Sequence, residues 1–205
     1  MVDRRPLLLV FLKAPAPGRV KTRLAAGIGA RAAARAHVAL SRATRDALAA
    51  ARGLRVVWVY AAAPRFRDLA WLGRPPGEVW PQGKGDLGTR LEAAFARAFA
   101  RGAPAALAIG ADCPELGARR LEAAAAALRA AEVVVCPAED GGYALIGLRA
   151  PRPALFRAIP WSSPRTLAAT LARARSLGLS VRRLERVSDV DRPADLAAWL
   201  LRVSA

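Results

Sequence analysis

Short apolar runs alternate with longer alanine- and arginine-rich runs along most of the chain, and this alternation most constrains the fold. The short runs have the length of buried strands, and the longer ones have the length and composition of helices. Alternating strands and helices predict an α/β protein whose mostly parallel sheet has helices on both faces. Strands are expected at Leu7–Leu12, Arg55–Ala61, Glu78–Trp80, Ala105–Ile109, Glu132–Cys136, Tyr143–Leu148 and Ser180–Arg186.

Helices fill the intervals between most of these strands. They are expected at Ala30–Arg52, Phe66–Trp71, Gly88–Arg101, Gly117–Ala131, Pro164–Leu177 and Pro193–Leu201. The connection before Tyr143–Leu148 is too short for a crossover helix, so one antiparallel element is expected there. The prediction is therefore a three-layer α/β/α fold with a mostly parallel mixed sheet. At 205 residues and 54% hydrophobic content, the chain can bury the core of a single domain spanning residues 1–205.

Several classes of protein do not fit this composition. The apolar runs fall far short of the ~20 residues that a membrane-spanning helix needs, so no membrane span is expected. Cys113 and Cys136 lack the spacing of a zinc site, and the only histidine, His37, lies in a helical pattern. Neither a zinc centre nor a cysteine–histidine or serine–histidine catalytic site is expected, and a reducing, cytoplasmic setting is the default.

The strong positive charge invites a nucleic-acid interpretation, but its distribution argues against one. The formal net charge is +17, and the arginines are dispersed over nearly every helix without a basic block or stripe. A dedicated nucleic-acid module would gather these charges on one face. We expect no specific nucleic-acid partner, and such a surface favours the approach of small anionic substrates.

Lysine is the rare basic residue in this chain, and it occurs only in loops that follow expected strands. Three of the 33 basic residues are lysines: Lys13, Lys21 and Lys84. The first loop, residues 13–24, holds Lys13, Pro15, Gly18, Lys21 and Arg23 just before a helix, where backbone amides and cationic side chains together favour phosphate. Its glycine spacing matches neither a Walker A loop nor a dinucleotide fingerprint. The competing interpretation is a basic surface loop.

A second glycine-rich loop, residues 82–91, also lies between a strand and a helix. It carries Gln82, Gly83, Gly85 and Asp86. The amide of Gln82 could read a base edge, because it offers a donor and an acceptor together. Asp86 is as well suited to capping the following helix as to binding a ligand.

Acidic residues follow three later strands in a chain where basic residues outnumber acidic ones. Asp112 follows the apolar strand Ala105–Ile109 and could hold a hard divalent cation, or form an Asx turn before Pro114. Asp189 and Asp191 alternate and could supply a second carboxylate, although Asp191 is also well placed to cap the last helix. Asp140 begins a further acidic and glycine-rich loop.

Taken together, five ordered motifs resemble one bacterial family. They are Lys13-x-Pro-x-Pro-Gly-x-Val-Lys-Thr-Arg-Leu24, Gln82-Gly-x-Gly-Asp-Leu-Gly-x-Arg-Leu91, Gly110-x-Asp-x-Pro-x-Leu116, Asp140-Gly-Gly-Tyr-x-Leu-Ile-Gly147, and Asp189-Val-Asp191 with Asp195-Leu196. The chain resembles the glycosyltransferase-like proteins of the GT-A, nucleotide-diphospho-sugar-transferase fold that are associated with radical-SAM or selenium-domain neighbours and arsenosugar synthesis. More distantly it is similar to the molybdenum-cofactor and phospholactate guanylyltransferases.

The resemblance implies roles for particular residues. The phosphate loop would hold a nucleotide or nucleotide sugar, Gln82 and Gly83 would lie near its base with Gly85, and Lys21 and Asp112 would be catalytic. Asp112 and Asp191 would bind Mg²⁺ or Mn²⁺. A small-molecule acceptor would approach Asp140, Gly141, Gly142, Tyr143, Trp161 and Ser162.

One departure from the family pattern leaves the reaction open. Asp112 is preceded by Gly110 and Ala111, so the Asp-x-Asp motif of many glycosyltransferases is absent. The expected function is a metal-dependent glycosyltransferase that uses a nucleotide-diphospho-sugar donor. The alternatives are a guanylyltransferase-like nucleotidyltransferase that joins a nucleoside triphosphate to a phosphorylated small molecule, and a non-catalytic nucleotide- or nucleic-acid-binding protein.

Overall fold

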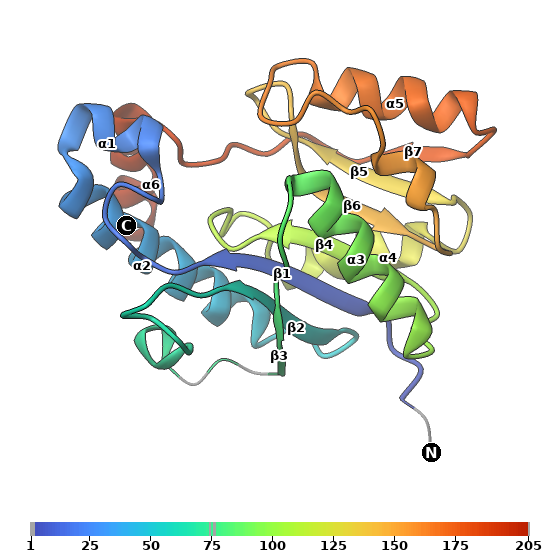
Figure 1. Cartoon of the computed structure of the whole chain (residues 1–205), viewed down its shortest axis with the longest axis horizontal. Helices are drawn as coiled ribbons and strands as arrows, with labels where there is room; N and C mark the ends of the chain where they lie inside the picture. The colour runs from blue at the N-terminus through green and yellow to red at the C-terminus, as the bar shows by residue number, and fades with distance from the viewer. Residues whose placement is uncertain (1–2, 74, 76, 205) are drawn as a thin grey trace.

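The described part of the chain contains one seven-stranded sheet in the order β3-β2-β1-β4-β6-β5-β7 (Figure 1). This computed structural model describes residues 3–73, 75 and 77–204. Strand β6 runs antiparallel to β4 and β5, and the other pairs are parallel. The strands are β1 (Leu7–Lys13), β2 (Arg55–Ala61), β3 (Glu78–Pro81), β4 (Ala106–Gly110), β5 (Val133–Pro137), β6 (Tyr143–Leu148) and β7 (Val181–Arg183). The antiparallel element predicted from the short connection is therefore β6.

Helices cover both faces of this sheet. They are α1 (Thr22–Ile28), α2 (Ala30–Leu48), α3 (Leu87–Ala100), α4 (Ala118–Ala127), α5 (Thr166–Ser176) and α6 (Pro193–Ser204), with short 3₁₀ helices η1 (Ala70–Leu72) and η2 (Pro153–Phe156). Successive side chains of β1 point to opposite faces. Leu8 and Val10 pack with α2 and α4, whereas Leu7 and Leu9 pack with α3 and α5. Burial on both faces explains the continuous apolar strands and confirms the three-layer α/β/α prediction.

The first helical segment differs from the sequence prediction. A single helix was expected over Ala30–Arg52, but a separate helix α1 precedes it and α2 ends at Leu48. Gly29 separates the two helices with φ of 82°, a left-handed conformation that glycine adopts readily, and its N–H donates to the carbonyl of Ala25. The loop that carries Lys21 therefore leads directly into α1.

Three other elements are shorter than predicted. The helix expected at Phe66–Trp71 is the single 3₁₀ turn η1, and the helix expected at Gly117–Ala131 ends at Ala127. Of the strand expected at Ser180–Arg186, only β7 (Val181–Arg183) forms a strand paired with β5. These ends are set by which backbone groups find partners, and propensity does not encode this.

A long segment after β7, residues 184–192, crosses the sheet to reach α6 (Figure 1). We call it the crossing segment. The backbone N–H groups of Leu184 and Val187 donate to carbonyls of β5, which holds its first half. Helix α6 then packs beside α1 and α2, where Trp199 contacts Leu40 in a small apolar cluster. The crossing segment thereby passes the carboxyl ends of the central strands.

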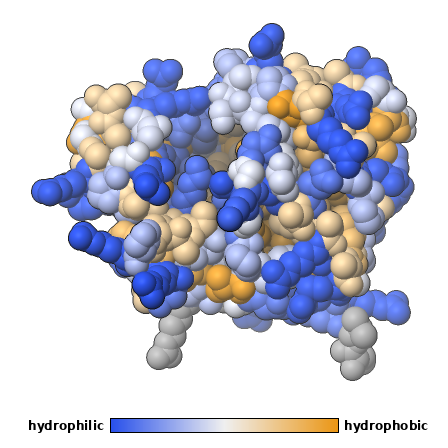
Figure 2. All heavy atoms as spheres, viewed as in Figure 1, coloured by the Kyte–Doolittle hydropathy of each residue, from blue (hydrophilic) through white to orange (hydrophobic). Residues whose placement is uncertain are grey.

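The surface visible in Figure 2 mixes hydrophilic side chains with apolar ones, and the hydrophilic residues are spread over this face. Among the described residues, no helix is long and apolar enough to cross a membrane.

Candidate active site

A cavity of about 730 Å³ lies where β1 and β4 end. We call it the nucleotide-side cavity, after the ligand that the sequence predicts for its loops. Strands β1 and β4 are neighbours in the sheet. The helices that follow them cover the same face. The loops that follow the two strands border the cavity. Ligands of open α/β proteins bind at this carboxyl edge. The lining side chains come from the loops after β1, β3, β4 and β5, from the loop before α5, from α2 and α3, and from the crossing segment. They include Lys13, Arg19, Lys21, Arg23, His37, Gln82, Asp86, Arg90, Asp112, Asp140, Trp161, Ser162, Asp189 and Asp191.

Lys21 lies at the centre of the charged groups. Its Nζ is 2.8 Å from Oδ2 of Asp112 and 2.9 Å from Oδ1 of Asp191, and its side chain is 3% exposed. Burial alone would lower the pKa of Lys21, but the two carboxylates outweigh it and raise this pKa. Lys21 also has left-handed backbone angles, φ 46° and ψ 49°, which are unusual for a residue other than glycine and concentrate at functional sites.

Asp112 fits against the backbone of β4 at a glycine. A Cβ on Gly110 would lie 2.6 Å from Oδ1 of Asp112, so a larger residue there would displace the carboxylate. Burial favours the neutral acid, but the Lys21 ammonium outweighs it and holds the pKa of Asp112 below its usual value. Asp112 is therefore an ionised carboxylate facing the cavity.

Three further carboxylates gather beside Arg23. Its Nη1 is 3.2 Å from Oδ2 of Asp140 and 3.1 Å from Oδ2 of Asp191. Asp140, Asp189 and Asp191 each offer an oxygen, and these oxygens all lie within 4.8 Å of one another. Burial, with help from Asp191 and Asp140, raises the pKa of Asp189 to about 6. The predicted metal pair of Asp112 and Asp191 is bridged by Lys21, and the compact oxygen cluster joins Asp191 to Asp140 and Asp189 instead.

The crossing segment is held so that its acids face the cavity. Oδ2 of Asp195 accepts hydrogen bonds from the backbone N–H groups of Asp191 and Arg192, at the start of α6. The carboxylate of Asp191 is bonded to Lys21 and Arg23. Asp195 thus supplies the acceptor at this helix terminus, and Asp191 faces the site.

Gln82 has a different environment from the one expected. Its Nε2 donates to the carbonyl of Val59 at 3.2 Å, its Oε1 accepts from Nη1 of Arg90 at 2.7 Å, and the residue is buried. Both ends of the amide are used within the protein. Gln82 therefore positions Arg90, whose guanidinium lines the cavity and whose Nε–H is buried without a partner in the described structure. Asp86 caps α3 by accepting from the N–H of Thr89 at 2.8 Å.

A smaller cavity of about 200 Å³ adjoins the first across Asp112, Asp140, Trp161 and Ser162. We call it the acceptor-side cavity. The rings of Tyr143 and Trp161 meet edge to face, with centroids 6.5 Å apart. The Tyr143 hydroxyl is buried, so the ring and not the hydroxyl lines the cavity.

Trp161 and Ser162 are placed by tight local geometry. A Cβ on Gly88 would lie 2.5 Å from Nε1 of Trp161, so α3 accommodates the indole only because position 88 is glycine. Ser162 has φ of 58°, the left-handed region. Of the residues predicted for the acceptor, Asp140, Gly142, Tyr143, Trp161 and Ser162 line this cavity.

Four predicted residues shape loops without lining either cavity. Gly18, Gly83 and Gly141 have φ of 77°, 77° and 84°, and Pro15 is buried in the loop after β1. At Gly141 a Cβ would lie 2.2 Å from the carbonyl oxygen of Pro164. These residues set the paths of the loops that carry the charged groups.

Two residues that line the nucleotide-side cavity, His37 and Arg90, had no role assigned to them from the sequence. His37 is buried on α2, where its Nε2 bonds the carbonyl of Lys13 at 2.9 Å, and burial lowers its pKa. As a neutral ring, His37 thereby anchors the start of the loop after β1. Arg90 belongs to the second motif but had no assigned role.

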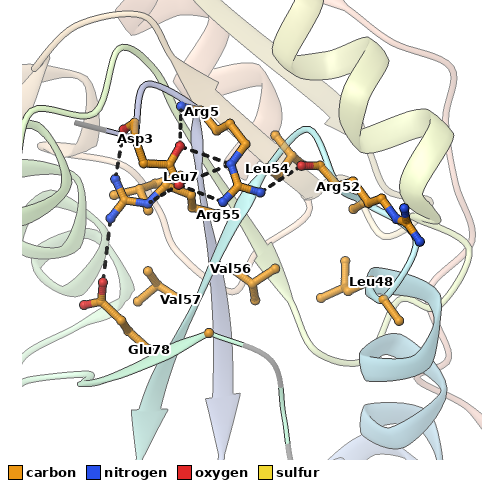
Figure 3. Close-up of a pocket in the computed structure, with 13 residues that line it drawn as sticks. Asp3, Arg5, Leu7, Leu48, Arg52, Leu54, Arg55, Val56, Val57 and Glu78 are labelled. Atoms are coloured by element: carbon orange, nitrogen blue, oxygen red, sulfur yellow. Dashed lines mark hydrogen bonds and ion pairs between the residues drawn. The ribbon is translucent and has the colours of Figure 1, made fainter. Parts of the chain in front are cut away.

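A separate cavity of about 330 Å³ lies at the opposite, amino edge of the strands (Figure 3). Four of its charged side chains are paired with one another: Arg5 binds Asp3 at 2.7 Å, and Arg55 lies 3.6 Å from Asp3 and 3.7 Å from Glu78. Arg5 also donates to the carbonyl of Arg52. These pairs hold the first residues of the chain against β2 and β3, which is a structural role.

Comparison with known proteins agrees with this fold. A crystal structure from Desulfovibrio desulfuricans G20, provisionally named a nucleotide-diphospho-sugar transferase, is 30% identical, with a TM-score of 0.85 over 95% of this chain and 85% of that one. A CMP:2-keto-3-deoxy-manno-octonic acid synthetase complexed with CTP shares the fold at 14% identity, TM-score 0.63, over 98% of both chains. Rv0371C of Mycobacterium tuberculosis H37Rv, solved with manganese, shares it at 18% identity, TM-score 0.56, over 96% of this chain and 98% of that one.

No curated protein matches the chain. Residues 30–163 match the model of the family described as "Uncharacterized protein conserved in bacteria (DUF2064)". This match covers more than half of the chain, and the structural neighbours share the predicted three-layer sheet. The chain therefore belongs to the DUF2064 family, with the fold of nucleotide-diphospho-sugar transferases.

Proposed function

We propose that the protein is a metal-dependent glycosyltransferase that takes its sugar from a nucleotide-diphospho-sugar. The single observation that carries this proposal is the meeting of Lys21 and Arg23 with four carboxylates in one cavity at the carboxyl edge of the sheet. The 30% identical neighbour with a nucleotide-diphospho-sugar transferase name supports the same class. The cavity of about 730 Å³ also has the size of an ordinary small-molecule site.

The charge balance of the site favours a divalent cation. Asp112, Asp140, Asp189 and Asp191 are opposed by the two cations that bond to them, Lys21 and Arg23. These acids outnumber the two cations that bond to them, and Lys13, Arg19 and Arg90 line the same cavity without an ion pair to the acids in the described structure. Carboxylate oxygens are the ligands that these hard cations prefer.

The oxygens of Asp140, Asp189 and Asp191 are close enough together to serve as one ligand set. Asp112 lies on the other side of Lys21, where it is available as an additional ligand. When bound, the metal supplies positive charge that stabilises the leaving diphosphate. The manganese found with the Mycobacterium tuberculosis fold relative is consistent with this donor set.

The basic residues align and neutralise the donor. Lys21 has three ammonium hydrogens, and its two carboxylate partners use two of them, which leaves one for a phosphate oxygen. Arg23 and Lys13 add positive charge at the same cavity. These groups, fixed by the loop and by His37, would orient the pyrophosphate before reaction.

In the proposed reaction an acceptor hydroxyl attacks the anomeric carbon of the donor sugar. The new carbon–oxygen bond forms as the bond between that carbon and the diphosphate oxygen breaks. The hydroxyl proton passes to a carboxylate or to water, and nucleoside diphosphate leaves. Lys21, Arg23 and a bound metal would stabilise the negative charge that develops on the leaving diphosphate, and this is the main electrostatic contribution of the site.

Thermal-shift measurements with nucleotide sugars and Mn²⁺ test the proposal. A ligand at 100 times its Kd stabilises the folded protein by about 2.7 kcal/mol, which for a chain of this length raises Tm by about 5–10 °C. Asp112→Asn should abolish turnover and weaken the metal dependence of this shift. The matched control is Asp46→Asn, an exposed aspartate on α2, which should behave as the wild type.

Two results would count against the proposal. If no nucleotide or nucleotide sugar stabilises the protein, with or without metal, the nucleotide-transferase assignment fails. If Asp112→Asn retains full, metal-independent affinity and the wild type shows no turnover, the protein is a non-catalytic binder.

A further inference from the structure

The two adjoining cavities differ in the charged side chains that line them. The nucleotide-side cavity has both signs, with five cationic side chains: Lys13, Arg19, Lys21, Arg23 and Arg90. The acceptor-side cavity is lined by no lysine, arginine or histidine among the described residues. Its charged groups are Asp112, Asp140 and Asp189, all on the boundary with the first cavity. Positive charge is therefore confined to one side of the site.

Several hydrogen-bond donors around this cavity are already bonded within the protein. The N–H of Thr166, at the start of α5, donates to the carbonyl of Ser163 at 3.1 Å. The N–H of Gly142 donates to Oδ1 of Asp140 at 2.9 Å. The hydroxyls of Ser163 and Thr166 both donate to the carbonyl of Pro160, at 2.8 Å each. These donors, which would bind an anion, are already used inside the protein.

What the acceptor-side cavity offers is hydrogen-bond acceptors and aromatic surface. The carboxylates accept hydrogen bonds, and the rings of Tyr143 and Trp161 form an apolar wall. The side chain of Ser162 has no hydrogen-bond partner in the described structure and lines both cavities. A molecule with hydroxyl or ammonium donors and an apolar face complements these groups.

A phosphate ester would be poorly accommodated there. It carries a charge of about −1.5 to −2 at neutral pH and would lie beside three carboxylates without a cationic side chain. Lys21 and Arg23 bond to Asp112 and Asp140 from the nucleotide side, at 2.8 and 3.2 Å, but neither basic side chain lines this cavity. Close approach of like charges in a partly desolvated site costs several kcal/mol in discrimination between ligands.

We propose that the acceptor is a small molecule without a phosphate group, which presents hydroxyl or ammonium donors to Asp140 and Asp189. This inference rests on the proposed function, because the acceptor is defined only by transfer from a nucleotide-bound donor. Such an acceptor fits glycosyl transfer onto a hydroxyl, with release of nucleoside diphosphate. Transfer of a nucleotidyl group onto a phosphate, with release of pyrophosphate, requires a cationic acceptor site that this cavity lacks.

The test compares two matched sets of compounds with the metal-bound wild-type protein. One set holds sugars, sugar alcohols and amino sugars, and the other holds the phosphate esters of the same compounds. Nucleoside diphosphate release is measured with nucleotide sugars, and pyrophosphate release with nucleoside triphosphates. The Tm of the nucleotide-loaded protein is measured with each set, so that binding is scored apart from turnover.

A variant adds the missing charge. Ser162→Lys introduces a cation at the cavity, and should improve binding of the phosphorylated set at least tenfold relative to the unphosphorylated set. Lysine replaces another residue that is not glycine at this left-handed position, so the backbone demand is unchanged. The control is Ser176→Lys, which adds the same charge at an exposed position at the end of α5 and should leave both sets unaffected.

Turnover or a Tm increase confined to the unphosphorylated set supports the inference. Turnover with the phosphate esters overturns it while the nucleotide-transferase proposal stands. Pyrophosphate release with the unphosphorylated set supports the acceptor class and overturns glycosyl transfer in favour of nucleotidyl transfer onto a hydroxyl. A nucleotide-loaded protein that neither set stabilises shows that this cavity is not the acceptor site. If no nucleotide binds, the proposed function is wrong, and the inference about the acceptor is wrong with it.

Discussion

Replacing Lys21 by methionine tests the arrangement on which the site depends. Methionine keeps most of the length of the side chain and removes its charge. Because neither lysine nor methionine is glycine, the left-handed backbone at position 21 costs about the same in both proteins. In the wild type Nζ lies 2.8 Å from Asp112 and 2.9 Å from Asp191, with 3% of the side chain exposed. The variant leaves two carboxylates without the ammonium that bridges them.

The size of the effect follows from burial. Removing one partner of a buried ion pair costs about 3–5 kcal/mol, because a buried charge is left uncompensated. Here the side chains of Asp112 and Asp191 are 38% and 29% exposed, so water screens part of the loss. We expect a decrease in unfolding free energy of about 2–3 kcal/mol, which for a chain of this length lowers Tm by about 4–12 °C.

Urea unfolding in EDTA measures this change, with the free energy obtained by linear extrapolation. Lys84→Met is the control, because Lys84 is exposed and has no ion pair in the described structure, and its loss should cost less than about 0.5 kcal/mol. Adding Asp191→Asn to Lys21→Met should recover part of the stability, since it removes one uncompensated charge. A single-variant loss no larger than that of Lys84→Met would refute a central role for the Lys21 bridge.

Two further predictions concern buried groups beside the site. Gln82→Leu leaves the carbonyl of Val59 and an N–H of Arg90 without their partners, and should lower the unfolding free energy by about 1–3 kcal/mol in urea titrations, whereas an unchanged midpoint would show that the Gln82 amide is dispensable. Burial raises the pKa of the Cys136 thiol, so the reactive thiolate is scarce at pH 8, and Cys113 is 2% exposed. Both thiols should react with a disulfide reagent only after unfolding, and rapid labelling of the native protein would contradict their placement.

Local patterns were sufficient to locate most strands and the loops that carry charge. Strands β2 and β6 have the predicted bounds, because each is an apolar run between turn-forming residues. The short connection before β6 required an antiparallel strand, since no crossover helix fits in it. The loops bearing Lys21 and Asp112 were expected at one edge, because parallel strands end together.

The partners of the charged groups were not readable in this way. Lys21 and Asp191 are 170 residues apart in sequence, and they meet only because the crossing segment passes the ends of β1 and β4. Gln82 was expected to face a ligand, but Val59 and Arg90 use both ends of its amide. Which donor finds which acceptor depends on the relative placement of distant elements, and local composition does not record it.

The sequence by itself determined that this is an α/β protein with basic and acidic loops after its strands, because periodicity and turn chemistry act over a few residues. Only the tertiary structure decided which charged side chains line each of the two cavities. It confined the cations to the nucleotide-side cavity and left the acceptor-side cavity with carboxylates and aromatic rings. This division arises because contacts between loops far apart in sequence are fixed by packing of the whole sheet and its helices.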